Sequence, residues 1–321
     1  MSYGQKSHVA ISFQSSYGTS NVTSLYHLQH LEESVGLNIP PLIDESARGV
    51  FDEGDGYSGP HTVDGDLSIN AKAIPVGVLL KGLMGPATTS AVTSLTAHLF
   101  KPRTSDFDTL SAGNPITYLK HMNDTGSASL FYNLNIGAIE FGCANGEFVT
   151  AKASFVGGTL SQNVDIAASF PTGKRFTWDA SSLQLNGSAV NNFRALTITI
   201  NENLEAMHTL NNTKYPGRVK RTRNRSIEVG GTVIFDDQTE YQKFISQSEQ
   251  SFKVSFAGPV NVGSGGTDKI EFDIPLLRYT EFKPTAAGAG KTEVSFTASA
   301  KYSTTSATSI AITLTNTQTV Y

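Results

Sequence analysis

The chain has 321 residues, enough for one large domain or two of ordinary size, and its net charge of −4 gives no overall reason to expect nucleic-acid binding. Its single cysteine, Cys143, excludes an internal disulfide and a multi-cysteine metal site. Because no stretch has the apolar length of a signal peptide or of a membrane helix, we expect a soluble protein made in the cytosol.

Most of the chain is patterned as β-strand. Apolar and polar residues alternate in segments such as His8–Gln14, Ser251–Gly258, Lys269–Leu277 and Thr292–Tyr302, as half-buried antiparallel strands require. Gly, Asn, Ser and Thr separate these segments where turns are needed. The sequence therefore predicts a mainly β fold.

Two short helices are predicted within this strand pattern. Pro75–Gly85 has proline at its start and glycine at its end, which are the residues preferred at those positions. Asp236–Ser248 begins with Asp236 as its expected cap and places Tyr241, Phe244 and Ile245 on one face.

A long charged loop precedes each helix-bearing segment. The loop between the strands Glu33–Ile39 and His61–Ile69 is acidic, with a single Arg48. The loop between Ala195–Asn201 and Ile227–Phe235 is basic. The acidic residues are Asp44, Glu45, Asp52, Glu53 and Asp55, and the basic ones are Lys214, Arg218, Lys220, Arg221, Arg223 and Arg225.

The order strand, charged loop, strand, helix, strand therefore occurs twice, which indicates an internal repeat. We align Val63-Asp64-Gly65 with Val229-Gly230-Gly231, and the remaining correspondences rest on order and pattern. They match Leu95–Phe100 with Ser251–Gly258, Leu134–Gly142 with Ile270–Phe282, and Val149–Gly157 with Glu293–Lys301. The repeat predicts two units, residues 1–168 and 169–321, with an insertion in the first at about 101–130.

Several stretches resemble the tail tube protein, or major tail protein, of long-tailed bacteriophages. They are Ser12–Thr19, Phe176–Gly187, Leu196–Asn212, Val229–Phe244 and Asp268–Phe282. They keep the family's order over most of the chain, and the match is strongest from about Phe176 onward. None of them is a catalytic signature.

The resemblance implies two tandem units, each a β-sandwich or small barrel with a short flanking α-helix and a long inter-strand loop. Six such units close a ring, so two per chain imply a trimer with pseudo-sixfold symmetry, whereas one unit per chain would require six chains. The stacked rings form a hollow tube through which double-stranded DNA is ejected. By resemblance we expect a flexible, non-contractile siphophage tail.

The same resemblance implies where the protein acts and what surrounds it. We expect a location in the virion tail after assembly in the bacterial host cytoplasm. The implied partners are further copies of the chain, tape measure protein and DNA in the lumen, and tail terminator and distal tail proteins at the ends.

The resemblance also suggests a role for the charged loops, because in this family the corresponding loop reaches the neighbouring ring. An acidic loop and a basic loop in equivalent places can select the angle between stacked rings, since like charges repel at close range. Two alternatives stay open: both loops are simply solvated, or the basic loop binds DNA phosphates. A conduit for sliding DNA favours a neutral or negative wall, so we expect the basic loop to lie away from the lumen.

No enzymatic motif has a readable context, and we predict no catalytic residue and no cofactor. His27 and His30, with Glu32 and Glu33, resemble part of a metal cluster but have no third ligand at a supporting spacing. Two structural alternatives share the strand-rich composition: a phage receptor-binding adhesin, and a distal-tail or terminator ring of the same fold.

Overall fold

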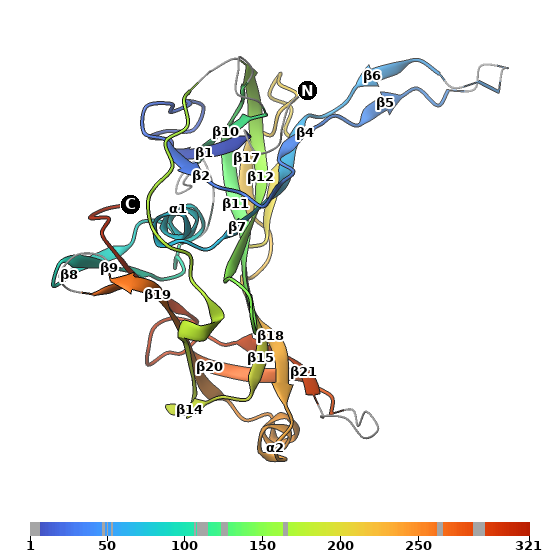
Figure 1. Cartoon of the computed structure of the whole chain (residues 1–321). Helices are drawn as coiled ribbons and strands as arrows, with labels where there is room; N and C mark the ends of the chain where they lie inside the picture. The colour runs from blue at the N-terminus through green and yellow to red at the C-terminus, as the bar shows by residue number, and fades with distance from the viewer. Residues whose placement is uncertain are drawn as a thin grey trace.

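The computed structural model shows a mainly β molecule, drawn in Figure 1. It describes residues 7–46, 49, 51–52, 54–105, 107, 115–122, 128–162, 166–261, 266–284 and 293–321. Within these ranges, eighteen strands are hydrogen-bonded into one sheet, and two further hairpins form separate two-stranded sheets. The alternating segments of the sequence are therefore strands, as predicted.

The elements fall into two halves along the chain. The first half contains β1 (His8–Phe13), β2 (Tyr26–Leu28), β3 (Glu32–Glu33), β4 (Gly36–Asn38), β5 (Pro41–Ile43), β6 (Gly56–Ser58), β7 (Thr62–Asn70), α1 (Ala73–Met84), β8 (Thr88–Val92), β9 (Leu95–Phe100), β10 (Ile116–His121), β11 (Ala128–Ala144) and β12 (Thr150–Gln162). The second half contains β13 (Ser181–Leu185), β14 (Ser188–Val190), β15 (Phe193–Asn201), β16 (Leu204–Met207), β17 (Arg218–Arg221), β18 (Ser226–Ile234), α2 (Thr239–Ser246), β19 (Gln250–Asn261), β20 (Thr267–Phe282), β21 (Glu293–Ala300) and β22 (Ala311–Asn316).

Both halves pair their strands in the same order. In the first half, neighbouring strands run β2, β1, β10, β11, β12, β7 and then β3 with β4. In the second half they run β14, β13, β19, β20, β21, β18 and β15. Every one of these pairs is antiparallel. The two orders match strand by strand, with the short strands β3 and β4 together at the place of β15.

The β-bulges repeat as well. The β11–β12 ladder shifts register between Ile136 and Ala138, and the β20–β21 ladder shifts between Tyr279 and Glu281. The β10–β11 and β19–β20 ladders each have a shift at their matching ends. Because a bulge inserts one residue at a defined position, it fixes which residues of the two halves correspond. Ala138 of β11 thus corresponds to Glu281 of β20.

This register corrects parts of the alignment made from the sequence. Gly65 lies opposite Phe155 on β12, and Val229 lies opposite Ala298 at the matching place on β21. Gly65 therefore corresponds to Val229, two residues away from the predicted Gly231. The alternation of apolar residues has a period of two, so a shift of two residues leaves the pattern unchanged.

The strand that corresponds to β19 is β10, not the predicted Leu95–Phe100. The latter forms β9, which pairs with β8 and with β22. Since β10 spans Ile116–His121, the predicted insertion at 101–130 contains a strand of the main sheet. Residues 106, 108–114 and 123–127 of that segment lie outside the described residues.

The two helices are found where they were predicted but differ in burial. Helix α1 ends at Gly85, whose φ of 95° suits glycine and whose N–H bonds to the Lys81 carbonyl. At α2 the Thr239 N–H donates to Asp237 Oδ1 at 2.7 Å, so Asp237 rather than the predicted Asp236 serves the helix start. Most of α1 is buried, whereas α2 has no buried residue.

The halves share one sheet and one core. Along β11, the edge beyond β10 pairs with β15, from Ala138 opposite Asn201 to Ala144 opposite Ala195. Buried apolar residues of both halves form one continuous cluster. In it, the ring centroids of Phe141 and Phe272 lie 4.9 Å apart. Phe176 is buried in this cluster, whereas Trp178, two residues further along, is 43% exposed.

The shared core predicts cooperative unfolding. Ile200 of β15 lies opposite Ile139 of β11, and both are fully buried. Ile200→Ala is expected to lower the free energy of unfolding by about 2–5 kcal/mol because it leaves a cavity between the halves. Chemical denaturation followed by fluorescence should show a single transition, and Val92→Ala on exposed β8 should leave its midpoint almost unchanged. Two transitions, of which only one moves in Ile200→Ala, would contradict the shared core.

Candidate assembly interface

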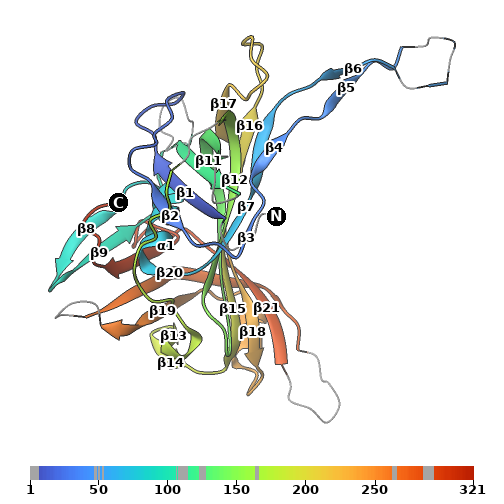
Figure 2. The ribbon, with the colours of Figure 1, turned by 45° about the horizontal axis from the view of Figure 1, so that its top comes forward.

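The acidic loop of the first half forms an arm that reaches away from the body of the molecule (Figures 1 and 2). Its stem is the β5–β6 hairpin, in which Leu42 lies opposite Tyr57. Leu42 is 63% exposed, Tyr57 is 64% exposed and Phe51 is fully exposed. An arm with exposed apolar side chains and a two-stranded stem has little to stabilise it in an isolated chain, which is typical of a segment that binds a partner.

The arm also presents its acidic side chains to solvent. The described acidic positions predicted as contact residues are Asp44, Glu45, Asp52 and Asp55, and all are exposed. The Ser46 hydroxyl and N–H both donate to Asp44, and these hydrogen bonds hold the pKa of Asp44 below its ordinary value. Glu53, the fifth predicted residue, and Arg48 lie outside the described residues.

The corresponding arm of the second half, the β16–β17 hairpin, packs on the first half of the same chain. Val219 is fully buried and contacts Gly157 of β12, whose φ of +87° and missing side chain leave room for it. Tyr17 donates its hydroxyl proton to the Pro216 carbonyl at 3.1 Å, and the Arg221 N–H bonds to the Phe107 carbonyl at 3.1 Å. Figure 2 shows this hairpin beside β11 and β12.

A buried carboxylate holds the base of the basic hairpin. Glu202 has a side chain only 1% exposed, and both Arg221 and Arg225 form ion pairs with it. Arg225 donates from Nε to Glu202 Oε1 at 2.6 Å, and its Nη2 also bonds to the Arg103 carbonyl at 3.0 Å. The buried Glu202 charge is therefore compensated within the chain, and the two partly buried guanidinium groups share it as their counter-charge.

The structure therefore divides the basic residues predicted to contact a neighbouring ring. Arg221 and Arg225 are engaged with Glu202, Arg218 and Lys220 are half-buried, and Arg223 is exposed. Among the described residues, no ion pair joins this hairpin to the acidic arm. Glu202 was missed from the sequence because a polar residue directly after a strand is also typical of a turn.

Removal of the buried carboxylate provides a test of this arrangement. Glu202→Ala is expected to lower the free energy of unfolding by about 3–5 kcal/mol, because two guanidinium groups then lose their counter-charge in a poorly hydrated place. Hydrogen exchange should show the largest loss of protection in the β16–β17 hairpin. Glu205→Ala, which removes an exposed carboxylate from β16, should change neither measurement, and equal effects of the two substitutions would contradict the clamp.

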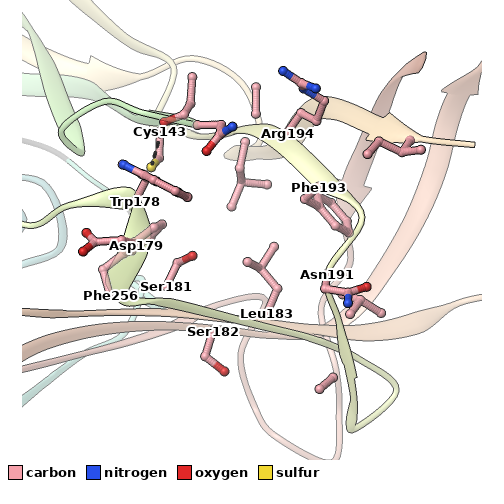
Figure 3. Close-up of a pocket in the computed structure, with 17 residues that line it drawn as sticks. Cys143, Trp178, Asp179, Ser181, Ser182, Leu183, Asn191, Phe193, Arg194 and Phe256 are labelled. Atoms are coloured by element: carbon pink, nitrogen blue, oxygen red, sulfur yellow. Dashed lines mark hydrogen bonds between the residues drawn. The ribbon is translucent and has the colours of Figure 1, made fainter. Parts of the chain in front are cut away.

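A hollow of about 530 Å³ lies next to the junction of the two halves (Figure 3). Trp178, Leu183, Phe193 and the end of β11 at Cys143 line it. Burial raises the pKa of the Cys143 thiol to about 11, so the thiol is protonated at neutral pH and is a poor nucleophile. A second hollow of about 640 Å³ lies beside β1 and β3, at the corresponding place in the first half.

Of the two histidines considered as metal ligands, His27 belongs to a cluster of aromatic rings and His30 is hydrogen-bonded elsewhere. His27 is buried next to His8, whose ring stacks on His121 with centroids 4.6 Å apart. His30 bonds to the Ser7 hydroxyl. The described part of the chain contains no group of three His, Cys, Asp or Glu that could hold a metal ion.

Burial, and to a smaller extent the neighbouring His8, lowers the pKa of His27 below its ordinary 6.5. The unfolded chain therefore takes up a proton at this position at a higher pH than the folded chain does. The contribution of the neutral His27 to the free energy of unfolding is consequently fully present above pH 6.5 and is lost as the pH falls below it. Thermal melts from about pH 7.5 to about pH 5.5 should show this decrease, and His27→Asn should flatten it. An unchanged pH dependence in that variant would exclude His27 as its source.

No helix in the described residues is long and apolar enough to cross a membrane. Comparison with protein-family models matches residues 4–300 of this chain to the family described as phage tail tube protein. No curated protein matches the chain closely enough to be counted as a relative.

Proposed function

The chain belongs to the phage tail tube protein family, and on this basis we propose that it polymerises into stacked rings that form the hollow tail tube of a non-contractile, siphophage-type tail. The match to the family over residues 4–300 is the observation that carries this proposal. The family is structural and is found in the virion tail. In the proposed tube, double-stranded DNA passes through the lumen when it is ejected.

We propose further that the chain carries two tube units, residues 1–168 and 169–321, so that three copies complete a pseudo-hexameric ring. The strand order and bulges that recur in both halves support two equivalent units. Neighbouring units in such a ring meet head to tail, and a head-to-tail contact closes into a ring when its rotation divides the full circle.

In the stacked tube, the acidic β5–β6 arm and the basic hairpin are proposed to set the angle between rings. Exposure of Asp44, Asp52 and Asp55 supports this role for the arm. On the basic side, Arg223 is the exposed member and carries the proposal, since Arg221 and Arg225 pair with Glu202. Opposite charges at close range specify register more than they add affinity.

The lumen is proposed to be neutral or negative, with the basic hairpin outside it, because dense cationic lining would bind phosphates and retard DNA. The net charge of −4 is consistent with such a wall. Tape measure protein and DNA would occupy the lumen, and terminator and distal tail proteins would cap the ends. Assembly would take place in the bacterial host cytoplasm.

Electron microscopy of the purified protein tests the tube. Long hollow filaments are expected at high protein concentration, with three copies of the chain per ring in averaged images. Single rings would instead indicate a terminator-like component, and unstacked trimers that bind host glycans would indicate an adhesin. Either result would replace the proposed function.

A charge exchange tests the proposed contact between rings. Asp52→Lys with Asp55→Lys is expected to block filament growth without changing the melting temperature, because both side chains are exposed on the arm. Adding Arg223→Glu should partly restore growth if the two loops meet. Asp179→Lys provides a matched control away from both arms. Normal filaments from the double lysine variant would rule out this role for the arm.

A further inference from the structure

The junction inside the chain has three parts. The end of β11 pairs with β15, and the Glu202 N–H extends this ladder with a bond of 2.8 Å to the Gly137 carbonyl. Helix α1 is buried in part by β20 and β22 of the second half. The β16–β17 hairpin packs back onto β12 of the first half. Each of these surfaces is therefore covered by the other half of the same chain.

The counterparts of these three parts are uncovered. Beyond Leu277, which lies opposite Gln250 of β19, β20 has no described strand along this edge at Glu281 and Phe282. Helix α2 has no buried residue, and its Ile245 is 56% exposed. The β5–β6 arm extends into solvent (Figure 1). The strand edge, the helix and the hairpin that are covered at the internal junction are thus exposed at the matching places.

The edge that would receive β20 is the outer edge of β3 and β4, the counterpart of β15. In the described residues these two strands pair only with β7. The Ser34 N–H bonds to the Asp66 carbonyl on β7, so strand alternation turns the backbone groups of Val35 and Leu37 to the outer edge. Lys120 already donates from Nζ to the Val35 carbonyl at 3.0 Å, a charge placed at an otherwise open edge.

We propose that the end of β20 in one copy of the chain pairs antiparallel with the outer edge of β3 and β4 in the next copy, in the register that β11 and β15 use inside the chain. This inference rests on the proposed ring and names its contact residues. Within the chain, Ala138 lies opposite Asn201 and Ile139 opposite Ile200. The corresponding contacts between copies are Glu281 with Asn38 and Phe282 with Leu37.

The chemistry of the two strands fits this register. Ile139 and Ile200 form the buried face of the internal junction. In the proposed junction, the same face carries Phe282, which is buried, and Leu37, which is half-buried and contacts the core. On the other face, Glu281 and Asn38 are both exposed polar residues. A one-residue slip would place Phe282 opposite Gly36 or Asn38, neither of which offers an apolar side chain, and would be unfavourable.

The helix and the arm then find partners at the same junction. The next copy covers α2 as the second half covers α1. The stem of its arm, the β5–β6 hairpin, packs on β21 of the first copy, as the β16–β17 hairpin packs on β12. The acidic residues beyond the stem, Asp44, Asp52 and Asp55, stay exposed to the next ring. The exposed Leu42 and Tyr57 of the arm leave water in this arrangement. A second copy of the chain is therefore the partner that covers the β20 edge and helix α2 and also buries the stem of the β5–β6 arm.

Disulfide trapping tests the register. In a Cys143→Ser background, we combine Asn38→Cys with Glu281→Cys, since directly opposed residues on antiparallel strands are within disulfide reach. Ala138→Cys with Asn201→Cys, the corresponding pair inside the chain, provides the control for oxidation and should yield cross-linked monomer. Gly36→Cys with Glu281→Cys, shifted by two residues, provides the control for register.

After assembly and mild oxidation, the first pair is expected to form reducible covalent oligomers about tenfold more efficiently than the shifted pair. The same samples are examined by electron microscopy. Tubes without covalent oligomers would overturn this junction and leave the proposed function in place. Covalent oligomers without tubes would support the junction and contradict the tube. Absence of both would contradict the two together.

Discussion

Edge pairing between β11 and β15 is the interaction on which the rest of the molecule depends. An edge strand presents unpaired N–H and C=O groups, and here the end of β11 satisfies those of β15 from Ala138 to Ala144. This pairing merges the two halves into one sheet, and apolar residues on its inner face, such as Ile139 and Ile200, merge them into one core. The β11–β15 pairing therefore holds the two halves in a defined orientation.

That orientation explains why equivalent elements differ in sequence character. Helix α1 lies between the halves and is almost entirely apolar, whereas α2 faces solvent on one side and carries Glu240, Gln242 and Lys243. The β16–β17 hairpin buries Val219 against Gly157, whereas the β5–β6 arm exposes Leu42 and Tyr57. In each pair, one member is covered by its own chain and the other is exposed to solvent.

Charge has two separate roles in the basic hairpin. Arg221 and Arg225 compensate the buried Glu202, so their charges hold the hairpin on its base. Arg223 is exposed, and its charge is available to a partner. A run of cations in one loop thus combines internal neutralisation with surface charge, and only burial distinguishes the two.

The amino-acid sequence by itself determined that the fold is mainly β, where the two helices lie, and the resemblance to the family that the match over residues 4–300 then showed. Alternation along Lys269–Leu277 and the Pro75–Gly85 boundaries depend on local chemistry, which a sequence displays directly. The tertiary structure alone decided register, as Gly65 and Val229 show, because alternation repeats every two residues and tolerates such a shift. It also decided that Glu202 is buried between two arginines and that β15 is joined to β11, since both depend on contacts between segments far apart in the chain.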